Sequence, residues 1–308
     1  MRNTRPASLK NGTRSLATVL RSLTGHLSIV YAFPFTIFLF FNWDAANTPC
    51  FSLDSWFALC AYVITETGGT KCAPLVGIVM LCLLVSRAGV SRKQRLAEAL
   101  VIFVFLVLFN GGGSALNEYV IKAVFQSPRP HIVYLAGDNG SGPLQMPVDE
   151  FYALAKEERH RLLRTVLEAE PPPLMLHRLI KEHWIATIGY SFPSGHAFAS
   201  MFFASFFLAM GLTLSSTPRR ICFFLLLPWA VCVAFSRVAL WVHSLRDVVV
   251  GSSIGMLIGV LAFVLVRACL TRMITKGKAR SDSSASSSPS FNWPCGRRFN
   301  VSHDRTMI

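Results

Sequence analysis

Charged residues are scarce in this 308-residue chain and make up 15% of it, whereas hydrophobic residues make up 52%. The apolar residues form runs of about 17–25 positions with almost no charge inside them, the length that crosses a bilayer core of roughly 30 Å. A soluble protein interrupts such runs with charged surface positions. The shortage of charge therefore excludes an ordinary soluble protein and predicts an integral membrane protein.

Patterns for binding metals or nucleic acids are missing as well. The eight cysteines include no Cys-x-x-Cys pair, so no zinc or redox motif is expected. No carboxylates cluster in the way that a Mg²⁺ site requires. The net charge is +14, but no basic stripe with interleaved aromatic residues accompanies it, so we expect no nucleic-acid partner.

The basic residues instead flank the apolar runs, where they indicate topology and contact with anionic lipid headgroups. The predicted fold class is all-α, a six-helix transmembrane bundle. The expected spans are 25–43, 72–87, 97–121, 194–214, 220–241 and 247–268. With six spans, the basic segments all lie on one side of the membrane, and the positive-inside rule assigns that side, with both termini, to the cytoplasm.

These spans divide the chain into three parts. We expect residues 1–24 to form a basic cytoplasmic N-terminus, residues 25–271 to hold the six spans, and residues 272–308 to form a cytoplasmic tail. The tail is rich in Ser, and low-complexity sequence of this kind predicts disorder.

The one large polar insertion, residues 122–193, lies on the outer side of the predicted bundle. Asp149 is a candidate helix N-cap, the apolar residues that follow it share one helical face, and Pro171 ends that helix. A second short helix is expected over 174–184. The insertion is thus predicted to be a small helical cap, and a further helix over 53–66 is expected at the membrane interface.

Three clusters of polar residues lie where the predicted spans meet the outer side. They run from Lys122 to Pro130, from Phe192 to His196 and from Ser236 to Asp247. Ionisable groups at membrane depth are costly and are usually functional. The clusters are far apart in sequence, yet the topology places them at the same membrane surface, where we expect one site.

The clusters supply complementary groups for a phosphate dianion. Lys122, Arg129 and Arg237 are three cations, and an Arg guanidinium binds two phosphate oxygens with its planar fork. Ser194 and Gly195 precede the fourth span, so their backbone N–H groups can point at an anion from a helix N-terminus. These five residues are the predicted phosphate-binding residues.

The remaining residues supply a nucleophile and an acid. His243 and Asp247 are four positions apart and share one face if the helix continues there. An Asp that hydrogen-bonds one imidazole nitrogen fixes the tautomer and leaves the other nitrogen free to attack phosphorus. His196 is then the general acid for the leaving oxygen. Because no carboxylate cluster is present, we expect a metal-independent reaction without a cofactor.

Each of these residues has a commoner structural explanation when it is taken alone. A single Lys or Arg near a span is usually a snorkelling anchor, and Ser-Gly after Pro is a common helix start. Ser236 is as consistent with a hydrogen bond to its own helix as with phosphate binding. Trp184, Tyr190 and Trp241 are expected to be interface anchors. The presence of all three clusters at one surface is what favours a catalytic site.

At these residues the sequence resembles the type 2 phosphatidic acid phosphatase superfamily, whose members are also called lipid phosphate phosphatases. The three-part signature of that family is Lys-x6-Arg-Pro, Pro-Ser-Gly-His and Ser-Arg-x5-His-x3-Asp. It is complete here as Lys122/Arg129/Pro130, Pro193–His196 and Ser236/Arg237/His243/Asp247.

Outside the signature, three segments are similar to bacterial phosphatidylglycerol phosphate phosphatases of this superfamily. They are Thr65–Thr67, Pro147–Tyr152 and His183-Trp184, and the likeness covers residues 25–268. The chain departs from that group at both ends and between Trp184 and Phe192, where it lacks an acid.

The resemblance implies a bacterial inner-membrane enzyme with six spans, a periplasm-facing site and cap, and a phosphohistidine mechanism. His243 would be the nucleophile, Asp247 its orienting partner and His196 the general acid. The implied substrates are membrane lipid phosphates, namely phosphatidylglycerol phosphate, phosphatidate, lysophosphatidate and undecaprenyl diphosphate.

Three other interpretations stay open. In the first, the main activity of the protein is hydrolysis of undecaprenyl diphosphate in carrier-lipid recycling. The chain can be a non-catalytic lipid-phosphate-binding or transport protein, although a pure binder needs only the cations. An alcohol in place of water can resolve the phosphohistidine, which gives lipid-to-lipid phosphotransfer. The sequence indicates no oligomeric state.

Overall fold

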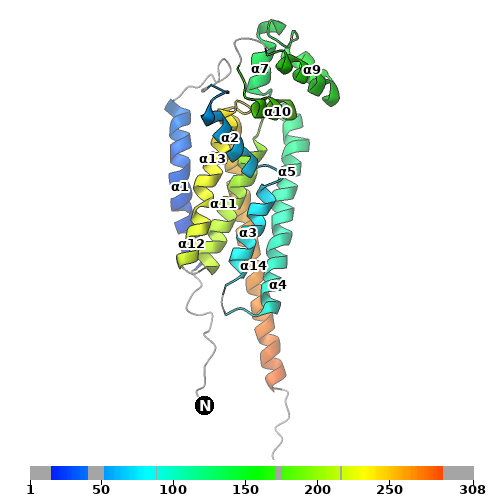
Figure 1. Ribbon diagram of the computed structural model, residues 1–308. Coiled ribbons are helices and arrows are strands. Elements are labelled where there is room, and N and C mark those ends of the chain that lie inside the picture. Colours follow the sequence, from blue (N-terminus) through cyan, green and yellow to red (C-terminus); the bar gives the residue numbers. More distant parts are fainter. Residues whose placement is uncertain (1–14, 41–51, 88, 171–174, 216, 287–308) are drawn as a thin grey trace, which may run out of the picture. The chain divides into compact units, whose positions relative to one another are not determined.

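The computed structural model describes residues 15–40, 52–87, 89–170, 175–215 and 217–286; for 29–40, 217–218, 274 and 276–286 it describes the backbone alone. Every regular element in this part of the chain is helical (Figure 1). The elements are α1 (Leu16–Phe40), α2 (Trp56–Thr67), α3 (Ala73–Val85), α4 (Arg92–Leu106), η2 (Val107–Gly111), α5 (Gly112–Leu116), η3 (Asn117–Ile121), α6 (Lys122–Phe125), α7 (Pro130–Ala136), η4 (Asp138–Gly140), α8 (Val148–Ala153), α9 (Lys156–Glu168), α10 (Arg178–Ala186), α11 (Gly195–Leu214), α12 (Thr217–Phe224), α13 (Leu226–Ala239) and α14 (Leu245–Ser286).

Four helical segments of the described residues are long and apolar enough to cross a membrane. They are Arg92–Ala136, Gly195–Leu214, Arg219–Ala239 and Leu245–Met273, and they match the third to sixth expected spans. At the place of the second span, α3 is a shorter apolar helix, and α1 begins well before the expected start of the first span at residue 25. The all-α prediction is confirmed, and the number of six spans stays a prediction.

By internal contacts the chain divides into two compact units, Met1–Ala268 and Cys269–Ile308. α14 continues to Ser286, although we expected the sixth span to end at residue 268 and disorder to follow from residue 272. The helix is longer because residues 269–286 contain a single Gly and no Pro, the two residue types that most disfavour a helix. Residues 287–308 lie outside the described part of the chain.

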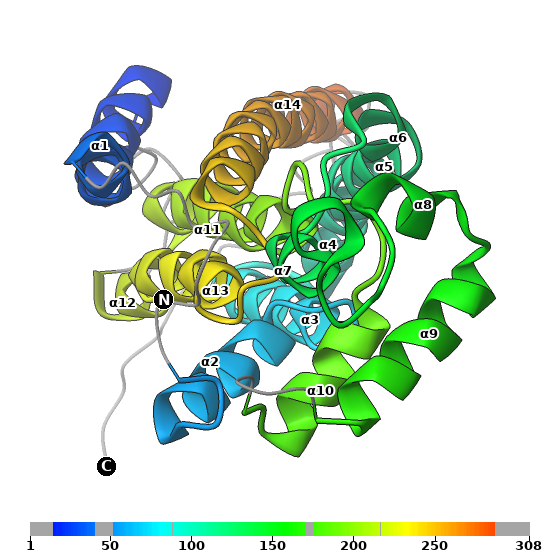
Figure 2. The same cartoon turned by 90° about the horizontal axis from the view of Figure 1, so that it is seen from above.

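The helix α11 lies in the middle of the bundle because it is apolar around its circumference. Almost all of its residues from Ala197 to Thr213 are buried, as expected for a helix without a polar face. It contacts α1, α3, α12 and α13, and Figure 2 shows it between these helices and α14.

The start of α14 is held against the start of α11 by three glycines. A Cβ at Gly251, Gly255 or Gly259 would come within 2.5, 2.1 and 2.7 Å of the backbone oxygens of Ser194, Phe198 and Phe202, respectively. Small residues at every fourth position let membrane helices approach closely. This contact places the third polar cluster beside the second.

A cap of helices α7 to α10 lies at one end of α11 and α13 (Figure 1). Its core contains Phe151, Leu163, Ile180 and Trp184, which are buried together with Trp241 from the connection between α13 and α14. Arg164 pairs with Glu182 at 3.3 Å, which links α9 to α10. The insertion therefore forms a helical cap, as the sequence predicts.

The prediction of a single helix that starts at Asp149 is wrong in detail. The N-cap is Pro147, and the chain is extended at Leu154 and Ala155, so two helices form instead of one. The second start is favoured by Glu158, whose side chain accepts a hydrogen bond from the backbone N–H of Ala155 at 3.2 Å. A Glu three residues into a helix stabilises its first turn in this way.

The expectation that Trp184 and Trp241 are interface anchors is also wrong. Both side chains are buried at 0% and 2% exposure, and the indole N–H of Trp184 donates to the carbonyl oxygen of Leu240 at 2.9 Å. Buried Trp usually satisfies its N–H in this manner. The two residues join the cap to the end of α13 and so set the height of the cap above the bundle.

Candidate active site

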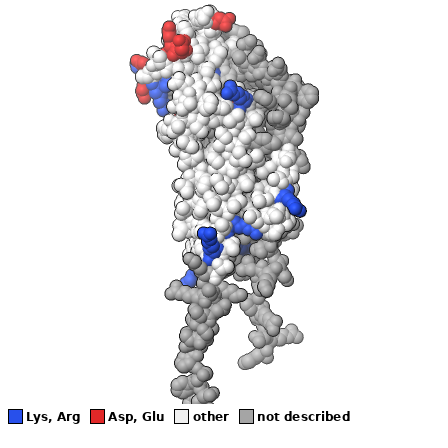
Figure 3. Space-filling model, turned by 180° about the vertical axis from the view of Figure 1, so that it is seen from behind, with Lys and Arg blue, Asp and Glu red and all other residues white. Residues whose placement is uncertain are grey.

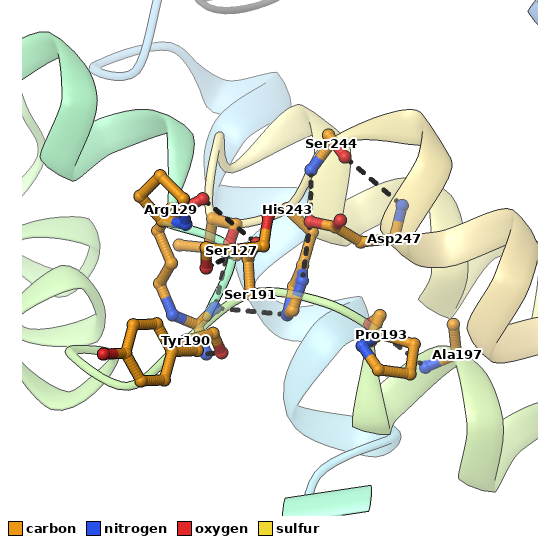
Figure 4. A network of polar contacts seen from close by, with 12 residues as sticks. Ser127, Arg129, Tyr190, Ser191, Pro193, Ala197, His243, Ser244 and Asp247 are labelled. Carbon is orange, nitrogen blue, oxygen red and sulfur yellow. Dashed lines mark hydrogen bonds and ion pairs between the residues drawn. The ribbon is translucent and has the colours of Figure 1, made fainter. Parts of the chain in front are cut away.

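The three polar clusters predicted from the sequence come together beneath the cap. Arg129 and His243 point toward each other with Nη1 and Nε2 3.1 Å apart (Figure 4). The backbone N–H of Ser194 donates to the carbonyl oxygen of Asp247 at 3.0 Å. Each of the three clusters therefore contacts another, although Arg129 and His243 are 114 positions apart.

We expected His243 and Asp247 to meet because they share one face of a continuous helix, but their contact arises in another way. α13 ends at Ala239, and Trp241 takes a left-handed backbone with φ of 59°. Ser244 then caps α14: its N–H donates to Asp247 Oδ2 at 2.8 Å, and Asp247 N–H donates to Ser244 Oγ at 3.2 Å. This reciprocal capping box holds Asp247 Oδ2 at 3.4 Å from His243 Nδ1.

The partners of His243 define its tautomer. A guanidinium can only donate hydrogen bonds, so Nε2 accepts from Arg129 and the proton is on Nδ1, which faces Asp247. The side chain is 2% exposed. Burial, and then the charges of Arg129 and Arg237, hold the pKa of His243 well below its usual value. The ring is therefore neutral, with a lone pair on Nε2, which is the form that a nucleophile requires.

Arg129 is held mainly by backbone carbonyl oxygens. Its Nε donates to Gly189 at 2.6 Å, Nη1 to Val242 at 2.9 Å and Nη2 to Tyr190 at 3.2 Å. Together with the contact to His243, these bonds engage most of the five N–H groups that a guanidinium has. The expected fork for two phosphate oxygens therefore requires that Arg129 exchange some of these partners.

Arg237 is fixed by two residues that lie outside the three predicted clusters. Its Nη1 donates to Thr65 Oγ1 and to His183 Nε2, both at 2.9 Å, and its side chain is buried at 1% exposure. Burial, and then the charges of Arg237 and Arg129, lower the pKa of His183 to about 3. His183 is therefore a neutral acceptor, and its Nδ1 lies 3.6 Å from Glu66 Oε1.

Lys122 is buried, and its Nζ lies 2.5 Å from Glu118 Oε2, one helical turn earlier. The sequence predicted the cation but missed this partner. Beside Glu118, the Asn117 side chain donates to the carbonyl oxygen of Pro193 at 3.2 Å. The turn that carries Lys122 is thereby tied to the Pro-Ser-Gly-His segment.

The start of α11 differs from the expectation in one respect. The N–H of Ser194 donates to the backbone carbonyl oxygen of Asp247, so it is not available to an anion, whereas its Oγ caps α11 at Ala197 N, 3.5 Å away. His196 lies against the connection between α2 and α3, where a Cβ at Gly69 would be 3.4 Å from its Nε2. Ser236 donates to the carbonyl oxygen of Val233 at 2.8 Å, in its own helix.

Metal ligands are not grouped in the described residues, where no three His, Cys, Asp or Glu side chains are arranged to hold an ion. The groups at the site are instead the three cations, the imidazoles of His243 and His183, which accept from Arg129 and Arg237, and single carboxylates beside Lys122 and His243. A metal-independent reaction stays a prediction that EDTA can test.

Comparison with known proteins gives a consistent family. The PAP2 superfamily matches residues 95–270, which include all the predicted site residues. Phosphatidylglycerophosphatase B of Escherichia coli (strain K12) is 32% identical over 222 residues, covering 70% of this chain and 79% of that protein. The protein of the same name from Haemophilus influenzae is 28% identical over 242 residues, covering 76% and 90%.

Proposed function

The chain belongs to the PAP2 superfamily, and from this premise we propose that it is a membrane lipid phosphate phosphatase that acts on phosphatidylglycerol phosphate and related lipids. The observation that carries the proposal is the line from Asp247 through His243 to Arg129. In this line a neutral imidazole presents Nε2 to a cation at the place where a phosphate would bind. A protein that only bound lipid phosphates would not need an oriented imidazole.

The proposed reaction has two steps. In the first, His243 Nε2 forms a bond to phosphorus while the bond to the lipid oxygen breaks, and His196 donates a proton to that oxygen. The Nδ1 proton stays between His243 and Asp247, which stabilises the positive charge on the ring. In the second step water attacks the phosphohistidine and gives a proton to His196, which lost one in the first step; the P–N bond breaks, and inorganic phosphate leaves.

The cations and the start of α11 stabilise the charge that develops on the phosphate oxygens. Arg237 and Lys122 supply fixed N–H donors, and Gly195 supplies a backbone N–H at the helix start. Arg129 contacts His243 Nε2 in the structure, so an incoming phosphate takes the place of that contact. The guanidinium then donates to the phosphate instead of to the nucleophile.

We also propose that the site faces the periplasm of a bacterial inner membrane. On the face drawn in Figure 3, acidic side chains lie at the end that carries the cap, together with some basic ones, whereas only basic side chains are seen toward the other end. The positive-inside rule assigns the basic end to the cytoplasm. Labelling a cysteine placed in α9 of a variant without the eight native cysteines, with an impermeant reagent in intact spheroplasts, tests this orientation, because a cytoplasmic cap would stay unlabelled.

The function is tested with a panel of lipid phosphates on purified protein in detergent. We expect phosphate release from phosphatidylglycerol phosphate and phosphatidate that EDTA does not affect and that vanadate inhibits. His243→Ala should lose at least about 10³-fold in rate, the scale of losing a nucleophile. No release from any lipid phosphate by the wild type, at normal yield and stability, would show that the proposed function is wrong.

A further inference from the structure

Glu118 is a charged residue on a helical segment whose other outward residues are apolar. Its side chain is 55% exposed, and Leu116, Tyr119 and Val120 around it are exposed at 52%, 78% and 50%. It lies in η3, a turn of π-helix, and such turns often occur at functional sites. Ionisable side chains on the apolar surface of a span are usually functional.

Glu118 lies between the phosphate site and the lipid-facing surface. Its Oε2 contacts Lys122 Nζ, whose side chain is only 7% exposed, so the ammonium points inward and the carboxylate stands outside it. Its Oε1 would be 3.8 Å from a Cβ at Gly189, the residue whose carbonyl oxygen accepts from Arg129. The carboxylate is therefore at the mouth of the site, between η3 and the connection that leads to α11.

Lys122 can hold Glu118 and a phosphate at the same time. An ammonium has three N–H groups, one of which is directed at Glu118. A phosphate oxygen that binds a second N–H of the same Nζ would lie within about 5 Å of the carboxylate, the sum of two short charge-assisted contacts. A bound phosphate thus has a fixed negative charge beside it on the side from which the lipid arrives.

We propose that Glu118 is a specificity-determining residue, which makes this site prefer lipid phosphate monoesters to lipid diphosphates. The inference rests on the proposed function and narrows its substrate class. In a diphosphate the second phosphate lies between the scissile phosphorus and the lipid, and hence beside Glu118. Two negative charges about 6 Å apart at an effective dielectric constant of 20–40 weaken binding by roughly 10- to 100-fold.

A monoester avoids this repulsion because its leaving oxygen is bonded to carbon and carries no charge in the bound substrate. In phosphatidylglycerol phosphate the second negative charge belongs to a phosphodiester on the far side of a glycerol. That charge is farther from Glu118 and nearer to water, where it is screened. Phosphatidylglycerol phosphate, the substrate proposed above, therefore belongs to the monoester class, whereas a prenyl diphosphate does not.

The test is the ratio of kcat/KM for farnesyl diphosphate to kcat/KM for phosphatidate, measured in one detergent. Glu118→Gln keeps the size and an oxygen acceptor for Lys122 but removes the charge, and we expect the ratio to rise about tenfold or more. A ratio does not depend on the folded fraction of each preparation. Glu168→Gln is the matched control, because Glu168 is an exposed acid four positions from its partner Arg164, at 3.7 Å, in the cap. It should leave the ratio within about twofold.

A second readout needs no turnover. Binding of inorganic pyrophosphate and of inorganic phosphate is measured by the rise in melting temperature in detergent. Glu118→Gln should strengthen pyrophosphate binding about tenfold relative to phosphate binding. An unchanged substrate ratio, or equal changes for the two anions, overturns the role of Glu118. If the wild type hydrolyses neither lipid, the result contradicts the proposed function and not the role of Glu118.

Discussion

Replacing His183 should impair the phosphate site through Arg237, although His183 belongs to the cap and lies outside the family signature. In the structure His183 Nε2 and Thr65 Oγ1 accept the two N–H groups of Arg237 Nη1. His183→Leu removes one acceptor and leaves a buried guanidinium N–H without a partner. His183→Gln keeps an oxygen that can take the same bond.

The expected size follows from the burial of Arg237, which is 1% exposed. An unsatisfied donor of a buried charged group costs about 1–3 kcal/mol. If the whole cost is lost from the stabilisation of the transition state by Arg237, kcat/KM for phosphatidate falls by about 10- to 100-fold. A loss of 1.4 kcal/mol corresponds to a tenfold change. We expect the inhibition constant of vanadate to rise by a similar factor, because the proposed mechanism has the same guanidinium bind this phosphate analogue.

Two comparisons separate this effect from a general loss of structure. His183→Gln should recover most of the activity, and Glu182→Gln, which breaks only the exposed pair with Arg164, should stay within about twofold of the wild type. The reasoning is refuted if His183→Leu is folded and binds vanadate as the wild type does. It is refuted equally if Leu and Gln at this position behave alike.

The remaining predictions concern the nucleophile, the packing of α14 and acid stability. Asp247→Asn should lower kcat by about 10²-fold or more in a phosphate-release assay, because an amide does not stabilise a charged imidazole. Gly251→Ala should reduce activity and melting temperature, since its Cβ would meet Ser194 O at 2.5 Å, whereas Gly112→Ala, whose Cβ would meet no atom beyond its own helix within 4 Å, should lower neither. The pKa of His183, about 3 in the fold against 6.5 unfolded, means that only the unfolded state gains a proton between these values, so stability falls as the pH drops from 6.5 toward 3. His183→Gln should therefore lose less in melting temperature than the wild type between pH 7 and pH 4.5, and an equal loss would contradict the assignment.

The site could be predicted from the sequence because its chemistry is concentrated in three short segments. The predicted spans and the charge bias of the segments between them placed Lys122, His196 and His243 at one membrane surface, and the fold brings their clusters into contact. The all-α class followed from the long apolar runs. These features depend on local composition and on membrane topology, both of which a single sequence contains.

The partners of the cations could not be predicted in the same way. Arg237 is fixed by Thr65 from α2 and His183 from α10, and such pairs depend on how separate elements pack. Glu118 lies four positions before Lys122, the spacing of a helical ion pair, but the apolar run around it indicates only a membrane span. The glycines from Gly251 to Gly259 were likewise a recognisable packing signal.

The predicted helix boundaries were wrong at two places where short-range hydrogen bonds override the helical periodicity of the sequence. The sequence pattern continued one helix from Asp149, yet the chain breaks at Ala155 because Glu158 caps a new start. His243 and Asp247 meet through a capping box at Ser244 rather than along a continuous helix. In both places a side chain bonded to the backbone decides the geometry.

The most direct test of the proposed mechanism is to trap the phosphoenzyme. Purified protein is mixed with ³²P-labelled phosphatidate, quenched in alkali, in which phosphohistidine is stable, and mapped by mass spectrometry. We expect label on His243 in the wild type, none in His243→Ala, and loss of the label in acid. Label on another residue, or turnover by His243→Ala at the wild-type rate, would contradict a nucleophilic His243.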